Sequence, residues 1–522
     1  MTFAAGTTLD IPLTNPSNYQ HLGKSTHSLV MDSTRSHDIF TPQPETQHSP
    51  IGIGNLPPEL LLKIAGFAKA TDTNSKGVLH KLCLVKPLNP AATYALYSNI
   101  HAGTDFNPVL LVRTLLSHPS LGALVRSLKL NAVWNGCQNQ KYRIAILNSD
   151  DPNTPPVTLE DLQGLTTDPV VKRLLQAPDV HFGAAACALL YLHTPNIHTL
   201  KYAVEGHYRK LKLPELSIMV STRPWEIPFL PGPLLQTPPT YNLLRNVTIR
   251  TPHIDIDRIA KLLQLPNLHQ LEVWNLRELQ PRNSWHWDAN FFPEHTSTVR
   301  HLTLRGGYLH VDVLSLVIQC CKSLSHFAYH MARNHNHRFQ LWTKFDRPTT
   351  IHFGVVVDAL RKHRGTLRHL ALYNTGAIDG RVAPNWIPAS LADLHNLENL
   401  CIDASVVFPR SSWGRLKDLL PASLKRVHLL HTWYDLMTDC VFVSGALYKI
   451  YDRYLVPHLS FVEMEVNREF WRWAEEAEME DEGFVYRASA VKALRAKGVR
   501  AVYRNREDRE NAWEVVRGWA EE

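Results

Sequence analysis

The chain has 522 residues, of which 44% are apolar and 20% charged, and its formal net charge is +7. These proportions exclude a chain that is disordered throughout, and so small a net charge requires neither nucleic acid nor an acidic membrane as a partner. No stretch approaches the ~20 apolar residues that cross a bilayer, and the N-terminus lacks the charged and apolar regions of a signal peptide. The seven scattered cysteines include no CxxC pair, which favours free thiols in the cytoplasm or nucleus.

The first hundred residues divide into a polar tail and a short helical unit. Residues 1–50 are rich in Ser, Thr, His, Asn and Pro, which predicts a disordered tail. Residues 51–101 predict three short helices. Pro57 and Pro58 fix φ at the start of the first helix, and Glu59 places negative charge at the positive end of its dipole. Apolar residues then recur at helical spacing as far as Ile100. A unit of this size cannot bury so much apolar surface alone, so it needs a partner.

This helical unit resembles an F-box. The matching residues are Leu56-Pro57-Pro58-Glu59-Leu60, Ile64, Leu82-Cys83-Leu84-Val85-Lys86 and Leu96-Tyr97-Ser98-Asn99-Ile100. The family docks on a Skp adaptor of cullin-based SCF ubiquitin ligases, so the resemblance implies those partners. The adaptor-contacting residues that it implies are Leu56, Pro57, Leu60, Ile64, Leu82, Val85, Leu96 and Tyr97. The alternative is that Leu56 to Leu61 merely open an ordinary core helix.

A short phrase recurs through residues 102–522: an apolar residue, two others, an apolar residue, one other, and an apolar residue. The phrases are Val125-Leu128-Leu130, Ile197-Leu200-Tyr202, Leu244-Val247-Ile249, Leu268-Leu271-Val273, Val299-Leu302-Leu304, Leu324-Phe327-Tyr329, Leu367-Leu370-Leu372, Leu397-Leu400-Ile402, Leu424-Val427-Leu429 and Leu459-Val462-Met464, with a degraded trace at Val499-Val502. Successive phrases mostly begin about 24 to 35 residues apart. This spacing is close to the leucine-rich-repeat period of roughly 20–29 residues.

Helical patterns precede most of these phrases, at residues 254–268, 311–324, 353–367, 414–424 and 443–459. A unit of helix, turn and short strand buries its apolar face only by stacking on its neighbours. The phrases resemble leucine-rich repeats, although Leu276, Gly307 and Thr375 stand where that family has asparagine or cysteine. We therefore predict an α/β chain: the F-box-like unit, then an irregular leucine-rich-repeat solenoid with a parallel sheet on its concave side and helices on its convex side. The alternative is an ordinary α/β domain with parallel strands.

Searches for catalytic and ligand-binding motifs give no site. The chain has no GxxxxGK[ST], GxGxxG after a strand, HExxH or GxSxG motif, so we expect no catalytic residue and no cofactor. His330, His335 and His337 do not have the spacing of a standard zinc site, so we expect no metal. No basic stripe with interleaved aromatic residues stands out, which argues against nucleic acid. Three polar inserts, at residues 135–178, 214–239 and 333–348, predict surface loops, and Trp285-His286-Trp287 either anchors a loop or contacts a ligand.

The repeat pattern predicts where a target binds. Strand side chains alternate between the two faces of a sheet, so the residues beside the buried apolar positions lie on the other face. At the position after the phrase this column contains Arg250, Trp274, Arg305, His330, Tyr373 and Asp403, and we predict that the first five contact the target. Trp, Arg and Tyr are the residue types that dominate binding hot spots. The alternative is that a solvent-facing sheet simply collects polar and aromatic residues.

Together these patterns predict a non-enzymatic substrate receptor. It would hold an unknown target protein on the repeat surface while the F-box-like unit docks the adaptor of a ubiquitin ligase. The alternative function is a protein-interaction scaffold in which the F-box-like helices only cap the end of the solenoid.

Overall fold

The structure is a computed structural model, and apart from a few isolated residues it describes residues 56–71, 75–102, 108–134, 193–206, 242–277, 292–307, 311–331, 353–374, 390–403, 420–430, 456–466 and 498–505. The chain divides into two units, residues 1–56 and 57–522, and the second contains every helix and strand named below. The predicted tail, the three inserts and Trp285–Trp287 lie outside the described residues, as do most of the helices predicted at 414–424 and 443–459.

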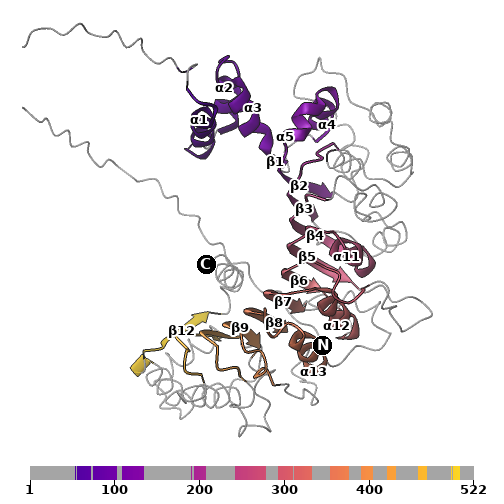
Figure 1. Cartoon of the computed structure of the whole chain (residues 1–522), viewed down its shortest axis with the longest axis vertical. Helices are drawn as coiled ribbons and strands as arrows, with labels where there is room; N and C mark the ends of the chain where they lie inside the picture. The colour runs from indigo at the N-terminus through magenta and orange to yellow at the C-terminus, as the bar shows by residue number, and fades with distance from the viewer. Residues whose placement is uncertain are drawn as a thin grey trace, which may run out of the picture. The chain divides into compact units, whose positions relative to one another are not determined.

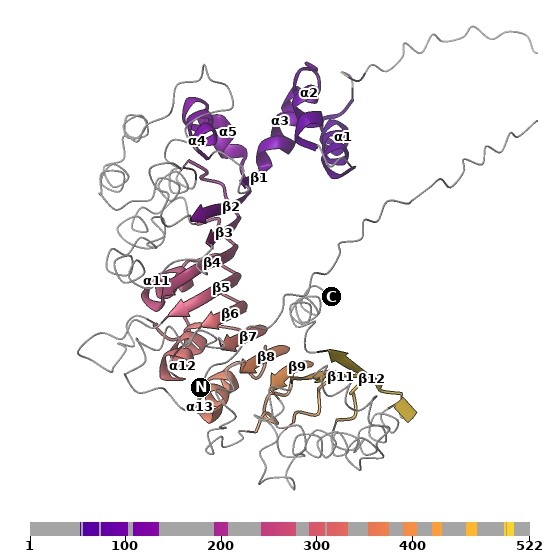
Figure 2. The same cartoon turned by 180° about the vertical axis from the view of Figure 1, so that it is seen from behind.

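Twelve strands form one sheet in which every pair of neighbours is parallel and the strands follow one another in chain order (Figures 1 and 2). They are β1 (Asn99–Ala102), β2 (Ser127–Trp134), β3 (Thr199–Gly206), β4 (Asn246–Asp255), β5 (Gln270–Arg277), β6 (His301–Gly307), β7 (His326–Met331), β8 (His369–Asn374), β9 (Asn399–Asp403), β10 (Arg426–Leu430), β11 (Phe461–Val466) and β12 (Arg500–Asn505). The predicted α/β class with a parallel sheet is confirmed. Such an order is what stacked repeats of one helix and one strand produce.

The described helices fall into two groups. The first is a three-helix unit made of α1 (Pro58–Thr71), α2 (Ser75–Cys83) and α3 (Asn89–Ser98). The second comprises α4 (Pro108–Ser117), α5 (Pro119–Leu124), α11 (Ile256–Leu263), α12 (Val311–Cys320) and α13 (Phe353–Arg361). Both views show α4, α11, α12 and α13 on the same side of the sheet (Figures 1 and 2). Three of the predicted helical segments, at 254–268, 311–324 and 353–367, contain α11, α12 and α13.

The core lies between the sheet and these helices. The fourth and sixth residues of the repeat phrases point into it: Leu271, Val273, Leu302 and Leu304 all have no exposed surface. One continuous cluster of buried apolar residues extends from Ile100 to Val499. Fully burying such a side chain contributes about 1.5–3 kcal/mol, so the apolar phrase provides most of the driving force for stacking.

Side chains in the turns tie each repeat to the preceding one. Asn396 donates its Nδ2 hydrogen to the carbonyl of Gly365 (2.7 Å), and the Thr366 hydroxyl donates to the carbonyl of Leu324 (2.8 Å). Both residues directly precede a repeat phrase. These bonds join successive turns just before the strands begin.

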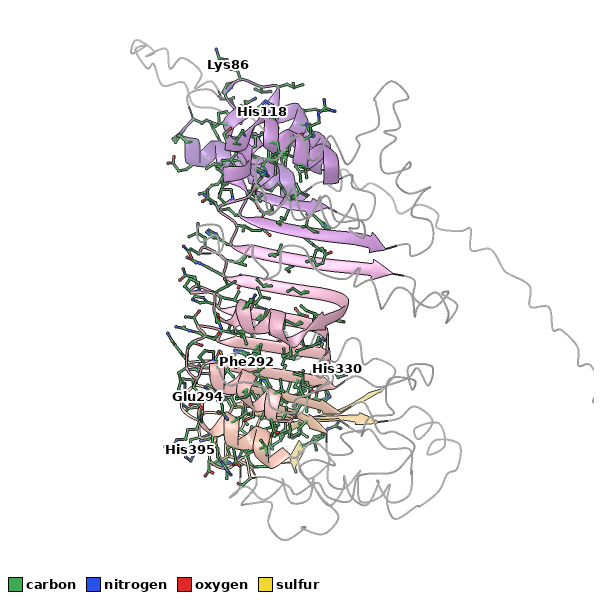
Figure 3. The ribbon with its side chains drawn as sticks, turned by 90° about the vertical axis from the view of Figure 1, so that its right-hand side faces the viewer. Lys86, His118, Phe292, Glu294, His330 and His395 are labelled. Atoms are coloured by element: carbon green, nitrogen blue, oxygen red, sulfur yellow. The ribbon has the colours of Figure 1, made fainter. Side chains whose placement is uncertain are left out.

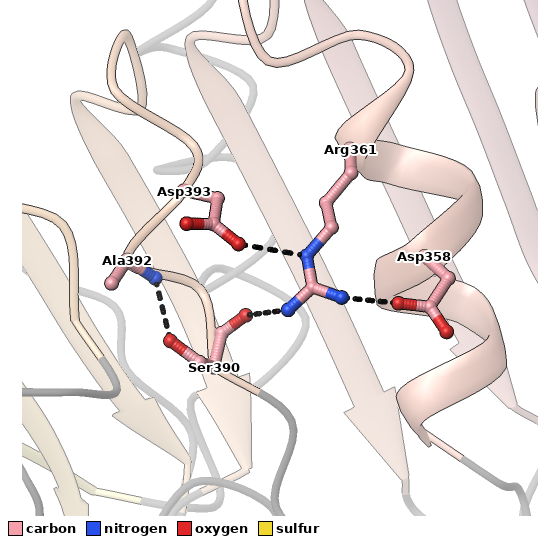
Figure 4. Close-up of polar contacts among 5 residues, drawn as sticks. All are labelled: Asp358, Arg361, Ser390, Ala392 and Asp393. Carbon is pink, nitrogen blue, oxygen red and sulfur yellow. Dashed lines mark hydrogen bonds and ion pairs between the residues drawn. The ribbon is translucent and has the colours of Figure 1, made fainter.

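Arg361 makes a further tie between repeats (Figure 4). This last residue of α13 forms ion pairs with Asp358, one turn earlier, and with Asp393, whose Oδ2 lies 3.0 Å from its Nε. Its guanidinium also donates to the carbonyl of Ser390 (3.4 Å). The contacts hold the turn that leads into β9 against the preceding helix.

The structure corrects the sequence analysis at both ends of the sheet. The helix predicted to continue through Ile100 ends at Ser98, and Ile100 lies on β1, where it is 8% exposed and joins the sheet core. The carbonyl of Ser98 accepts the N–H of Arg126 (2.8 Å), which starts the parallel ladder at this point. On β12 the alignment predicted for the degraded phrase at Val499–Val502 is wrong by one residue, because Ala501, not Val502, pairs with Val462.

Within the described part of the chain, no helix has the length and apolar character needed to cross a membrane.

A close backbone approach at Gly122 gives a test of the packing between α5 and the turn before β3. A Cβ atom at this position would lie 2.1 Å from the carbonyl oxygen of His193. We predict that Gly122→Ala lowers the free energy of unfolding by about 1–3 kcal/mol, because backbone must move to relieve the clash. Gly354→Ala is the matched control, since a Cβ there meets no atom within 4 Å. Equal thermal denaturation midpoints for the two variants would contradict the packing described.

Candidate functional site

The predicted target-binding residues stand in one column across neighbouring strands. Arg250 pairs with Trp274, Trp274 with Arg305, and Arg305 with His330, which in turn pairs with Tyr373. They lie on the face of the sheet opposite the buried phrase residues, which we call the outer face. Figure 3 views the strands from the side and shows His330 near the edge where they end, whereas His395 lies near the edge where they begin. The side chain of Tyr373 lies outside the described residues.

Trp274 forms the centre of a compact cluster. The guanidinium carbons of Arg250 and Arg305 lie 4.4 and 4.3 Å from its ring centroid, one residue coming from each neighbouring strand. Its indole Nε1 donates to Oε1 of Glu272 (2.6 Å), and the same carboxylate oxygen lies 3.7 Å from Arg250 and 3.9 Å from Arg305. We call these four residues the Trp274 cluster.

The cluster is a preorganised surface with an accessible cation. Cation–π contacts contribute about 0.5–1 kcal/mol each at exposed sites, and exposed ion pairs contribute less. These contacts therefore add little to the stability of the fold, but they hold the indole of Trp274 in one orientation. The Arg250 side chain is 48% exposed, whereas that of Arg305 is 11% exposed. Arg250 is therefore the member that a partner reaches most easily.

Three histidines form a stack at the start of β6, β7 and β8. His326 lies between His301 and His369, with ring centroids 4.0 and 3.9 Å apart and planes within 14° and 9° of parallel. At one end of the stack, Nδ1 of His369 lies 2.8 Å from the side-chain amide nitrogen of Asn399. In the middle of the stack, Nδ1 of His326 lies 2.9 Å from the Ser325 hydroxyl.

The stack favours neutral imidazoles. Burial, together with the neighbouring His369, His301 and Arg368, lowers the pKa of His326 to about 2. Burial also lowers the pKa of His369 to about 4, against an opposing effect of Glu398. A proton on any of these rings would place a positive charge about 4 Å from the next ring. The stack therefore stays uncharged at neutral pH.

Farther along the outer face, the third residue of three neighbouring strands is buried. Cys401, His428 and Glu463 stand directly beside one another on β9, β10 and β11, and each is at most 2% exposed. Nδ1 of His428 lies 3.5 Å from Oε2 of Glu463. A thiol, an imidazole and a carboxylate are the groups of a cysteine nucleophile and its base. Burial this complete instead favours a structural polar tie between strands.

The predicted adaptor-contacting residues divide into two sets. Leu60, Ile64 and Val85 are 43%, 37% and 41% exposed, and Pro57 is also exposed. Leu82 and Leu96, in contrast, pack on the core of the three-helix unit itself, which contains Ala65, Leu79, Ala91 and Ala95. Tyr97 packs against the sheet core, and Leu56 is half-buried.

Several other apolar residues of this unit are exposed that were not predicted to contact the adaptor. Leu62, Phe67, Leu84 and Tyr94 are 41%, 71%, 86% and 38% exposed. Among the described residues, seven of the ten large apolar side chains that are exposed belong to α1–α3 or to the turn after α2. We call these seven (Leu60, Leu62, Ile64, Phe67, Leu84, Val85 and Tyr94) the apolar patch. The surplus of apolar residues in the sequence was the available signal, but periodicity alone did not identify the outward positions.

The part of the chain that the structure describes contains no group of three His, Cys, Asp or Glu residues suited to holding a metal ion. Of the histidine-rich segment considered above, His330 is described and half-buried, whereas His335 and His337 lie outside the described residues.

The chain matches no protein-family model, and no curated protein matches it. The resemblances to an F-box and to leucine-rich repeats therefore rest on the residues quoted above.

The histidine stack predicts acid sensitivity. An unfolded histidine has a pKa of about 6.5. The unfolded chain therefore takes up protons between about pH 6.5 and pH 4 that His326 and His369 refuse in the folded state, so stability falls as the pH falls through this range. We predict that the thermal midpoint decreases from pH 7 to pH 4.5, and that His326→Gln makes this decrease shallower.

His395→Gln, a change at an exposed histidine near the start of the strands, serves as the control and should leave the profile unchanged. A decrease in His326→Gln as steep as that of the unmodified chain would contradict the role of the stack.

Proposed function

We propose that this protein is the substrate-recognition subunit of an SCF-type ubiquitin ligase, docking an adaptor through α1–α3 and a target through the outer face of the sheet. In this proposal α1–α3 is an F-box, the sheet and its helices are degenerate leucine-rich repeats, and the protein works in the cytoplasm or nucleus without catalysis of its own. The cullin-based ligase supplies the ubiquitin-transfer chemistry.

The apolar patch is the observation that carries the proposal. A three-helix unit with a core of mostly small residues, Ala65, Leu79, Ala91 and Ala95, leaves seven larger apolar side chains in water. Large exposed apolar surface on a soluble protein marks a protein-binding site, and all seven side chains belong to this one small unit. Its placement on residues that resemble an F-box supports a Skp adaptor as the partner.

The Trp274 cluster supports the second half of the proposal. Binding hot spots are enriched in Trp and Arg, and an anchor that is already fixed loses little conformational entropy on binding. The indole of Trp274 is held between two guanidinium groups and by Glu272 before any partner arrives. It lies on the outer face at the column where the repeat pattern places the target.

One observation favours the alternative function, a scaffold in which the helices only cap the sheet. Helix α3 ends at Ser98 and β1 begins at the next residue, Asn99. Tyr97 also packs against the sheet core. Capping accounts for this junction, but it does not account for Leu84, which is 86% exposed. The receptor is therefore the better supported function.

The adaptor half of the proposal predicts a loss of binding without a loss of stability. Leu60→Ala with Leu84→Ala should weaken binding of a purified Skp adaptor by about tenfold or more in isothermal titration calorimetry, since burying each leucine contributes about 1.5–3 kcal/mol. Leu243→Ala with Val355→Ala removes two exposed apolar side chains outside the patch and is the matched control. If the first pair instead lowers the thermal midpoint and leaves adaptor affinity unchanged, the helices are a cap.

The target half predicts that the Trp274 cluster decides which proteins are captured. Trp274→Ala should remove a set of proteins from affinity purifications analysed by quantitative mass spectrometry, while adaptor recovery stays constant. Lys322→Ala, at an exposed residue in the turn after α12, is the control. An unchanged set of captured proteins in Trp274→Ala would place target binding elsewhere.

A further inference from the structure

A row of basic side chains precedes the strands. The residue just before each strand donates its N–H to the carbonyl of the equivalent residue one strand earlier: Arg245 to His198, and His198 to Arg126, both at 2.8 Å. The same bond continues at 2.8–2.9 Å through every strand as far as β11. The permanent cations of this row are Arg126, Arg245, Arg300, Arg368 and Lys425. We call the row the edge ladder.

These cations are evenly spaced. They precede β2, β4, β6, β8 and β10, so a permanent charge occurs at every second strand. Neighbouring strands lie about 4.8 Å apart, which separates successive cations by about 9.6 Å. The positions between them hold His198, His269, Ser325 and Glu398.

The three central arginines are the accessible part of the ladder. Arg245, Arg300 and Arg368 are exposed, and among the described residues no carboxylate lies within ion-pair distance of them. At the two ends the charge is already engaged, because Arg126 donates to the carbonyl of Asn196 (3.2 Å) and Lys425 pairs with Glu398 (3.0 Å). The centre of the ladder is therefore a line of positive charge without a described counter-ion.

The geometry of the row favours a polypeptide over a nucleic acid. The turn residues two positions before the ladder residues, such as Asn267 and Thr366, are uncharged and donate to backbone carbonyls. A double helix presents two charged backbones. A single strand needs aromatic faces on which bases stack, but both faces of Trp274 and of His326 are already covered.

We propose that the edge ladder binds an extended acidic polypeptide segment that carries a carboxylate at every third residue. In a polyproline II helix, three residues make one turn with a rise of about 3.1 Å each, so every third side chain projects from the same side at intervals of about 9.3 Å. This interval matches the separation of about 9.6 Å between alternate strands. The inference concerns a surface separate from the apolar patch, and it holds whether or not α1–α3 docks an adaptor.

Fluorescence anisotropy with the full chain and a labelled (Glu-Pro-Pro)₅ peptide tests the proposal. A peptide of the same composition with its five glutamates contiguous controls for net charge. We expect the spaced peptide to bind at least about fivefold more tightly than the contiguous one at low salt. Arg245→Gln with Arg300→Gln and Arg368→Gln should weaken its binding by about tenfold, as three lost surface ion pairs would.

The control variant Lys63→Gln with Lys81→Gln and Arg113→Gln also removes three positive charges, but from exposed helix positions outside the ladder. It should leave the affinity for the spaced peptide unchanged. Equal affinity for the two peptides, or equal weakening in the two triple variants, would overturn the proposal. The proposal would also be overturned if an oligothymidylate of equal charge bound the ladder more tightly than the spaced peptide, because the partner would then be a nucleic acid.

Discussion

The hydrogen-bonded register between neighbouring parallel strands determines where every side chain of the repeat region lies. A slip of one residue on any strand would exchange its two faces, exposing residues such as Leu271 and Val273 and burying Glu272. Each buried leucine contributes about 1.5–3 kcal/mol, so even a single slip would be costly. The turn side chains of Asn396 and Thr366 fix the same register a second time, through hydrogen bonds to the preceding turn.

Because the register is shared, residues far apart in sequence become neighbours in columns, and each column has its own chemistry. One column builds the Trp274 cluster, in which Arg250 and Arg305 approach the indole from adjacent strands. Another stacks three imidazoles and keeps them neutral. The residues just before the strands form the edge ladder. The protein thus obtains several distinct surfaces from a single repeated backbone geometry.

The columns of the outer face follow from the sequence as soon as the phrases are aligned, because an apolar residue at every second position identifies the buried face. The edge ladder and the stacking of His326 between His301 and His369 were not predicted, although aligning the phrases brings these three histidines into one column. Their members are separated by tens of residues, so no local charge run or aromatic cluster indicates them.

The short strand β1 was missed for a different reason, since Ile100 continues the helical spacing of Tyr97 and Leu96. The outward positions of α1 and α2, such as Leu84, depend on how three helices pack together, which periodicity does not determine.

The junction between α3 and β1 joins the three-helix unit directly to the sheet. Tyr97 is packed against the sheet core, while Leu84, on the turn between α2 and α3, remains 86% exposed. An adaptor bound at the apolar patch would therefore be attached to the sheet through a single continuous segment of chain, without an intervening linker. This arrangement suits a receptor that must hold its target in a constant position relative to the ligase.

Cysteine cross-linking across two strands tests the shared register most directly. Asn246 on β4 and Gln270 on β5 are paired on the outer face, so their Cα atoms should lie within the roughly 4.4–6.8 Å that a disulfide spans. Under mild oxidation, Asn246→Cys with Gln270→Cys should give a cross-linked tryptic peptide pair in high yield by mass spectrometry. Thr248→Cys with Gln270→Cys, two residues out of register on the same face, should not. Equal cross-linking of the two pairs would contradict the register and, with it, every column described.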